Sequence, residues 1–320
     1  MNMEEDKLLV KIAEMYYQED KNQSQISKAL NIHRTTISRL LKRTREEGIV
    51  NISINYDYAG TYRLENQLEE MFGLEKAIIV PVATDMKLEQ KNKMLAEAVN
   101  TYLKTKIKDN MILGFSWGKT IAAVGEALAI EGVKHITCVP MIGGPAGRLC
   151  SDYHVNTITY QAAKNLEAKA LLIDAPAIPE TIALKDALLK NDFNQALSQM
   201  WKQLDIAILG IGSPCLSMNE TWSQFYGDDV TALLEREQAV GDVVSRFYTM
   251  DGIEIKSDLN DRIVGISTYD LKQTKIRIGV VEAVEKAKAI VGAMHGRYIN
   301  VLVTTEETAR EVLTISKRQS

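Results

Sequence analysis

Apolar residues recur at helical spacing through the first part of the chain. A first helix is expected over residues 4–18, with one apolar stripe made by Leu8, Leu9, Ile12, Ala13 and Tyr16. Two further apolar groups follow the i, i+3, i+4 pattern: Ile26, Ala29 and Leu30, and then Ile37, Leu40 and Leu41. Asn31-Ile32 interrupts the pattern between these groups. Two short helices separated by a tight turn predict a helix-turn-helix unit, against which the first helix packs.

Local sequence signals mark the limits of this unit and of its helices. Asn22 followed by Gln25 resembles a capping box at the start of the second helix, whereas His33 is a poor N-cap for the third. After Gly48, a glycine suited to the C′ position, residues 49–54 alternate imperfectly and predict a short β wing. Residues 56–60 have the composition of a linker. We therefore expect a helix-turn-helix domain at residues 1–55 and a second domain at 56–320.

From residue 61 onward the pattern changes to alternating helices and strands. Strands are expected at 77–82, 111–115, 136–140, 170–174, 206–210, 276–281 and 300–304. Helices are expected at 61–72, 88–107, 119–129, 155–166, 228–238 and 282–294. Nearly continuous apolar strands that alternate with helices predict an α/β domain with a doubly wound, largely parallel sheet covered on both faces.

Charge singles out the helix-turn-helix segment. The chain carries 38 basic and 42 acidic residues, for a net charge of −4, but residues 21–45 contain seven basic residues and no acidic one. Such a local inversion indicates a surface for a polyanion, here double-stranded DNA; the alternative is a helical hairpin with a solvated basic face. The side chains expected to contact DNA are Ser24, Gln25, Arg34, Thr35, Thr36, Ser38, Arg39, Lys42 and Arg43.

Other features limit the class of protein. No apolar run approaches the length of a transmembrane helix, and the first residues lack the pattern of a secretory signal. The three cysteines and four histidines are scattered, which argues against a disulfide framework or a metal site. We therefore expect a cytoplasmic protein without metal or cofactor.

Strand-to-helix loops are where ligands bind in doubly wound sheets. The loop at 114–120, GFSWGKT, offers backbone N–H groups and the side chains of Ser116, Lys119 and Thr120, a setting for an anion; the alternative is a tight turn with a solvated lysine. It is no Walker A loop, because that spacing requires glycine where Leu113 stands. A nucleotide-binding kinase or switch is therefore disfavoured.

Three further loops carry candidate ligand contacts. Residues 140–149, PMIGGPAGRL, form an irregular loop in which Arg148 is either an anion clamp or a surface charge. Residues 210–214, GIGSP, are too short for a dinucleotide fingerprint. Lys286 opens a helix after the strand at 276–281, and it either contacts a ligand or points to solvent. His154 and Asn156 start another helix, where the histidine is either a ligand contact or a structural residue. Asp242 either accepts hydrogen bonds from sugar hydroxyls or is an aspartate at a strand edge. Trp222 and Phe225 belong to a lid or to the core.

Taken together and in order, seven segments resemble the SorC family of bacterial transcriptional regulators. They are IHRTTISRLLKR, GFSWGKT, VPMIGGPAGRL, YHVNTITY, DIAILGIGSP, AVGDVVSRFY and HGRYINVLVT. The combination is most similar to the branch named for L-sorbose utilisation. The resemblance implies a helix-turn-helix domain joined to a non-enzymatic sugar-binding domain, related in fold to sugar-phosphate isomerases and deaminases. It also implies a homo-oligomer, a dimer or tetramer, that controls a sugar-catabolic operon in response to a sugar or sugar phosphate, here expected to be L-sorbose or L-sorbose 1-phosphate.

By position, the resemblance places the effector contacts on particular residues. With Trp117 and Arg148 from the loops above, they are Ser116, Gly118, Lys119, Thr120, Gly143, Gly144, His154, Asn156, Asp242 and Lys286. Two departures stand out. Ile142 replaces the lysine that forms a Schiff base in deoxyribonucleoside regulators, and Glu282-Ala283 replaces a glycine pair, which adds a negative charge. The latter is compatible with a less charged sugar.

A sugar-phosphate isomerase or deaminase is the remaining alternative. Such an enzyme would need a paired acid and base in its pocket, and the sequence nominates none. It would also leave the basic segment 21–45 without a purpose.

Overall fold

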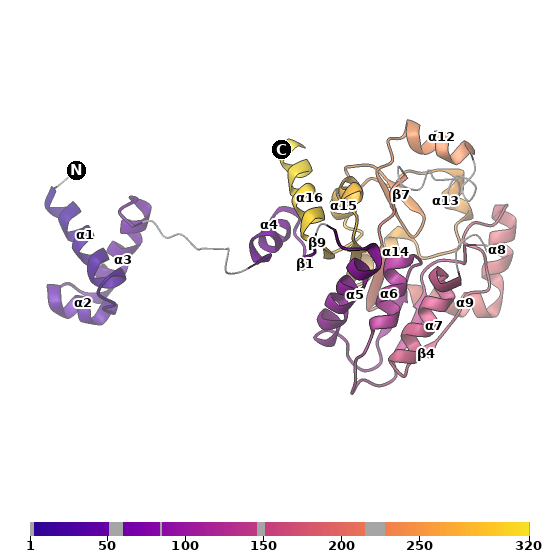
Figure 1. Ribbon diagram of the computed structural model, residues 1–320, viewed down its shortest axis with the longest axis horizontal. Coiled ribbons are helices and arrows are strands. Elements are labelled where there is room, and N and C mark those ends of the chain that lie inside the picture. Colours follow the sequence, from indigo (N-terminus) through magenta and orange to yellow (C-terminus); the bar gives the residue numbers. More distant parts are fainter. Residues whose placement is uncertain (1–2, 51–59, 84, 146–150, 215–227, 320) are drawn as a thin grey trace. The chain divides into compact units, whose positions relative to one another are not determined.

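The computed structural model describes residues 3–50, 60–83, 85–145, 151–214 and 228–319 (Figure 1). The chain divides into two compact units, Met1–Tyr58 and Ala59–Ser320. The boundary expected after residue 55 falls within the undescribed stretch 51–59, as does most of the expected wing at 49–54.

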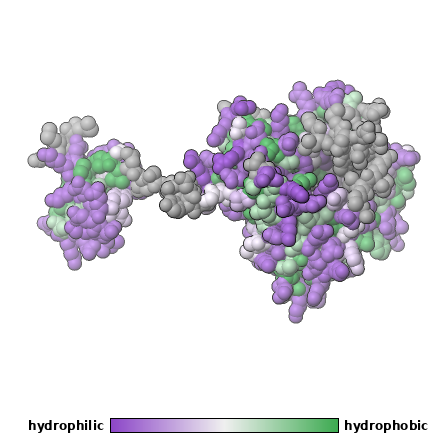
Figure 2. Space-filling view, in the orientation of Figure 1, coloured by the Kyte–Doolittle hydropathy of each residue, from purple (hydrophilic) through white to green (hydrophobic). Residues whose placement is uncertain are grey.

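The first unit is a bundle of three helices, α1 (Met3–Tyr17), α2 (Gln23–Leu30) and α3 (Arg34–Glu46). Its core consists of Leu9, Ile12, Met15, Ile26, Ile37, Leu40 and Leu41. Two predicted core positions were wrong: Tyr16 is exposed and pairs edge to face with Tyr17, while Met15 takes the buried place, and Ala29 is exposed. Helical spacing alone does not decide which edge of an apolar stripe a third helix covers. On the face seen in Figure 2, hydrophilic residues dominate this unit.

The second unit is an α/β domain built on one parallel sheet. Its strands are β1 (Lys76–Val80), β2 (Ile112–Phe115), β3 (Thr137–Pro140), β4 (Lys169–Ala170), β5 (Ile206–Gly210), β8 (Ile276–Val281) and β9 (Val301–Thr305). Their order is β1-β9-β8-β5-β2-β3-β4, and every neighbouring pair is parallel. From the β2–β5 pair the chain winds outward through β3 and β4 on one side and through β8 and β9 on the other, while β1 lies at the far edge beside β9. The largely parallel, doubly wound sheet expected from the sequence is confirmed.

Helices cover both faces of this sheet (Figure 1). Helices α5 (Leu88–Lys104), α6 (Lys119–Ala127) and α7 (Val155–Asn165) pack mainly on one face. On the other face lie α4 (Tyr62–Phe72), α9 (Asp192–Trp201), α15 (Ala287–His295) and α16 (Glu306–Gln319). Within the described stretches, no helix has the length and apolar character needed to cross a membrane.

The remaining elements lie outside the seven-stranded sheet. They are η2 (Ser151–Tyr153), α8 (Ile182–Lys190), α12 (Asp228–Arg236), α13 (Asp258–Arg262), α14 (Thr268–Gln273), η3 (Val284–Lys286) and the antiparallel hairpin of β6 (Gly241–Val243) and β7 (Arg246–Tyr248). The hairpin packs on α15, where the Tyr248 hydroxyl donates to the Ala289 carbonyl at 3.0 Å.

Several predicted elements differ in extent from the structure, two of them for a structural reason. The strand expected at 170–174 pairs only through Lys169–Ala170, because the Asn156 side chain, instead of a neighbouring strand, bonds both main-chain groups of Ile173. The helix expected from residue 282 begins at Val284 as the short 3₁₀ turn η3, and α15 follows it.

Candidate functional site

The first candidate site is the exposed face of α3. The predicted capping box of α2 is present: Asn22 Oδ1 accepts from the N–H groups of Ser24 and Gln25 at 3.1 and 3.0 Å, and Gln25 Oε1 accepts from the Asn22 N–H at 2.9 Å. Gln25 is therefore committed to the cap. His33 makes no side-chain cap for α3, and its Nδ1 lies 2.9 Å from the hydroxyl of Thr35.

The three arginines of α3 that were assigned to DNA differ in their surroundings. Arg34 and Arg39 are exposed, and neither forms an ion pair with any described residue. Arg43 lies 2.6 Å from Glu5 of α1 and 2.7 Å from Glu47. These carboxylates, Glu5 first, raise the pKa of Arg43. Its guanidinium therefore joins α1 to α3. The DNA contact expected of Arg43 stays a prediction, in which a phosphate would compete with these two carboxylates.

Lys42 retains only a weak link to its own helix. Its ammonium lies 3.4 Å from Glu46, but both side chains are more than half exposed. Such an exposed pair contributes little to stability, so Lys42 stays a candidate for DNA contact. Ser24, Thr36 and Ser38 are exposed or half-buried on α2 and α3 and so remain accessible.

The second candidate site lies beyond the carboxyl ends of β2 and β5, where the winding of the sheet reverses. This is where open α/β sheets bind ligands. Ser116 is buried, and its Oγ accepts from the Gly210 N–H at 3.1 Å, which joins the two strand ends. Gly118 precedes α6 with φ +115°, a conformation that suits glycine. Trp117 is half-buried beside it, and Lys119 is exposed with its Nζ 5.6 Å from the Tyr153 ring.

Asp242 on β6 meets the loop after β5 directly. Asp242 and Gly212 exchange main-chain hydrogen bonds of 2.9 and 3.2 Å. A Cβ on Gly212 would lie 1.9 Å from Asp242 Oδ1, so only glycine admits the carboxylate here. Burial raises the pKa of Asp242 to about 6, against the opposing effects of a 3.1 Å bond from the Ser245 N–H and the positive charge of Lys286. The fold therefore brings two predicted contacts, Asp242 and Lys286, into electrostatic contact.

The loop after β3 is held by its backbone. Gly143 N–H donates to Val264 and Gly144 N–H to Ala175, each at 2.8 Å. A Cβ on Gly144 would lie 2.6 Å from His154 Nε2, so the imidazole packs directly on this glycine. Burial lowers the pKa of His154, whose Nδ1 accepts from the Asn156 N–H at 3.1 Å.

Some predicted contacts are committed elsewhere or lie outside the described residues. The Asn156 amide donates to the Ile173 carbonyl and accepts from the Ile173 N–H, both at 2.9 Å, which is a supporting role. Ile142 is fully buried in the core, and no lysine stands there. Arg148, Trp222 and Phe225 lie outside the described residues. Among the described residues, no group of three His, Cys, Asp or Glu side chains could hold a metal ion.

Comparison with known proteins decides the family. Residues 56–314 match the family described as "Putative sugar-binding domain", and residues 4–51 match "Homeodomain-like domain". The sorbitol operon regulator of Klebsiella pneumoniae is 40% identical over 314 residues, which cover 98% of this chain and 99% of that protein. The chain belongs to the SorC family of sugar-responsive transcriptional regulators.

Other members of the SorC family agree with this assignment. The deoxyribonucleoside regulator of Bacillus subtilis (strain 168) is 30% identical over 313 residues, which cover 98% of this chain and 99% of that protein. The crystal structure of the full-length sorbitol operon regulator SorC from Klebsiella pneumoniae matches with a TM-score of 0.76 and 39% identity, over 96% of this chain and 98% of that one. Like these relatives, this SorC-family chain is a transcriptional regulator rather than an enzyme.

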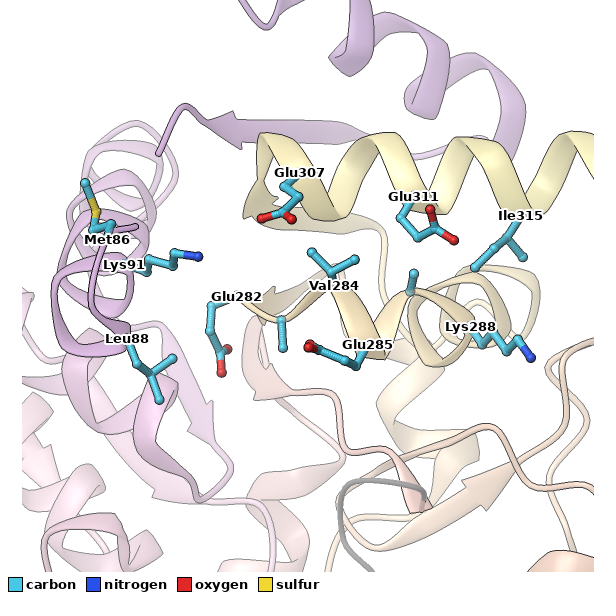
Figure 3. Close-up of a pocket in the computed structure, with 12 residues that line it drawn as sticks. Met86, Leu88, Lys91, Glu282, Val284, Glu285, Lys288, Glu307, Glu311 and Ile315 are labelled. Carbon is cyan, nitrogen blue, oxygen red and sulfur yellow. The ribbon is translucent and has the colours of Figure 1, made fainter. Parts of the chain in front are cut away.

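Sequence reasoning noticed Glu282 only as a departure from the SorC-family pattern and did not name it as a site residue. Glu282 follows β8, and its Oε2 accepts from the Thr120 hydroxyl at 2.9 Å, across 162 positions of sequence. Glu282 also lines a groove of about 780 Å³ between the start of α5, the turn η3 and α16 (Figure 3). An acidic residue directly after a buried strand was the available signal, but no sequence pattern pairs it with Thr120.

Proposed function

We propose that this protein binds operator DNA through α3 and releases or rearranges it when a sugar binds beyond the carboxyl ends of β2, β5 and β8. The observation that carries the proposal is the 40% identity to an operon regulator, which extends through both units. The exposed guanidiniums of Arg34 and Arg39 provide the DNA contacts, and the residues around Asp242 and Lys286 bind the effector.

The DNA-binding step needs two copies of the chain. A dimer or tetramer would set two α3 helices on major-groove segments spaced about 34 Å apart for each helical turn. A sugar can change this arrangement only to the extent that it binds one state more tightly than the other. We place the subunit contacts on the effector-binding unit, so that sugar binding there can act on the arrangement of the subunits.

L-sorbose and L-sorbose 1-phosphate are the effectors proposed from the sequence. Sorbitol is a third candidate, because the 40% identical relative is named a sorbitol operon regulator. Asp242 accepts hydrogen bonds from the hydroxyls of such a ligand, while Lys286 and Lys119 donate. Thr120 and His154 line the same edge of the sheet.

Thermal melting of the full chain against a panel of sugars and sugar phosphates tests this proposal. A ligand that binds only the folded state raises the melting temperature with its concentration. The same ligand should alter operator binding in a gel-shift assay.

Two variants sharpen the test. Lys286→Ala should bind operator normally but need more sugar to respond, whereas Lys288→Ala, an exposed lysine two positions away, should respond as the unmodified chain does. Equal responses of both variants would remove Lys286 from the site. Failure of every sugar and sugar phosphate to shift the melting temperature would refute the effector proposal.

A further inference from the structure

The N-terminus of α6 is placed where an anion would bind. It lies next to the β2–β5 pair, at the point where the sheet reverses its winding. Its first N–H groups have no partner one turn earlier in the helix, and Gly118, the residue before it, has no side chain with which to cap them. A phosphate group at such a position is held by these N–H groups and by the helix dipole.

A carboxylate of the chain itself is held beside the first turn of α6 by a side-chain hydrogen bond. The Thr120 hydroxyl, in the first turn of α6, donates to Glu282 Oε2 at 2.9 Å. The main-chain carbonyl of Glu282 in turn accepts from the hydroxyl of Thr308 at 3.3 Å, and Thr308 is fully buried on α16. Glu282 is thus fixed at its backbone by α16 and at its side chain by α6.

We propose that Glu282 occupies the anion position of α6 and thereby selects an effector without a phosphate group, an uncharged sugar or polyol. This inference rests on the proposed function, since it concerns the same effector site. Thr120 engages one oxygen of Glu282, and the other can accept a hydrogen bond from a ligand hydroxyl. The phosphate group of an ester, with a charge of about −1.5 to −2 at neutral pH, chiefly accepts hydrogen bonds and is repelled by the carboxylate.

The surroundings of Glu282 reinforce this selection. The groove that it borders also exposes Glu285, Glu307 and Glu311, against two lysines, Lys91 and Lys288 (Figure 3). Four carboxylates and two ammonium groups therefore border the groove, which leaves an excess of negative charge on this side.

The effector side of Glu282 carries two further lysines. The positive charge of Lys286 opposes the rise in the pKa of Asp242. Part of the attraction of Lys286 for anions is therefore already engaged by this carboxyl and is not available to a second anion. Lys119 lies over the ring of Tyr153. A neutral polyol can use both lysines and both carboxylates, because each of its hydroxyl groups donates as well as accepts.

The test compares Glu282→Gln with the matched control Glu285→Gln in the full chain. Both changes remove one negative charge from the groove, but only Glu282 bonds Thr120. Calorimetric titration with inorganic phosphate, L-sorbose, L-sorbose 1-phosphate and sorbitol measures the preference of each protein.

We expect the unmodified chain to bind an uncharged sugar more tightly than its phosphate ester and to show no saturable binding of inorganic phosphate. Glu282→Gln should bind the phosphate ligands about tenfold more tightly, because it removes a like charge at close range, while Glu285→Gln should change little. Tighter binding of the ester by the unmodified chain, or equal behaviour of the two variants, would overturn the inference and leave the proposed function standing. Binding of none of the sugars or esters would instead refute the proposed function.

Discussion

Replacing Asp242 by asparagine should stabilise the protein at neutral pH while weakening its response to sugar. Burial raises the pKa of Asp242 from 3.8 to about 6, so the folded state holds its proton more tightly than the unfolded chain does. The difference between these two pKa values corresponds to a free energy of about 3 kcal/mol, at ~1.4 kcal/mol for each pKa unit. Asp242 keeps partial contact with solvent, which lowers the expected effect to about 2 kcal/mol.

The sign of this effect depends on pH. The contribution of Asp242 to stability is fully present below pH 3.8, and it is lost as the pH rises through about 6, because the buried carboxyl must then ionise. Asp242→Asn lacks this ionisation but keeps an oxygen that can accept from the Ser245 N–H. The variant should therefore match the unmodified chain near pH 4 and exceed it by about 2 kcal/mol at pH 8.

Urea unfolding at pH 4, 6 and 8 measures this difference, with Asp251→Asn at an exposed turn as the control. The control should be no more stable than the unmodified chain at any of the three pH values. If Asp242→Asn were less stable than the unmodified chain at pH 8, the buried carboxylate would be a net source of stability and the reasoning from burial would fail. A sugar response that survives the substitution would separate Asp242 from effector binding.

Three further changes test other parts of the structure. Arg39→Ala should weaken operator binding by about 1–3 kcal/mol without lowering the melting temperature, whereas Arg43→Ala should chiefly lower the stability of the first unit. Gel shifts measure the first effect and melting curves the second. The reverse result would contradict the ion-pair assignment. Ile37→Ala should cost the helix-turn-helix unit about 2–5 kcal/mol while sugar binding persists, as circular dichroism and calorimetry would record. Gly144→Ala should displace His154 and cost about 1–3 kcal/mol with a reduced sugar response; unchanged melting and response would show that the loop adapts freely.

The sequence predicted the sheet well where burial is uniform. Residues 206–210 and 276–281 form strands with the bounds expected, because both are almost wholly apolar and covered by helices on two faces. The strand expected at 170–174 failed at the sheet edge, where the Asn156 amide takes over the main chain of Ile173. A side chain that replaces a neighbouring strand leaves no periodic signal.

The sequence could predict where the site residues lie, but not which of them bond to one another. The ends of parallel strands meet at one edge, so the loops containing Ser116, Asp242 and Lys286 could be grouped in advance. The engagement of Arg43 by Glu5 and of Thr120 by Glu282 spans 38 and 162 positions. Contacts over such distances depend on how complete elements pack, which spacing along the chain does not encode.

The bond between the Tyr248 hydroxyl and the Ala289 carbonyl has a mechanical consequence. It ties the hairpin that carries Asp242 to the helix that begins just after Lys286, and Tyr248 also stacks on Tyr298 with 5.0 Å between ring centroids. We therefore expect the hairpin and α15 to move together when the domain rearranges. A sugar bound by Asp242 and Lys286 would then act by tilting these two elements against the start of α6, where the Thr120 hydroxyl donates to Glu282.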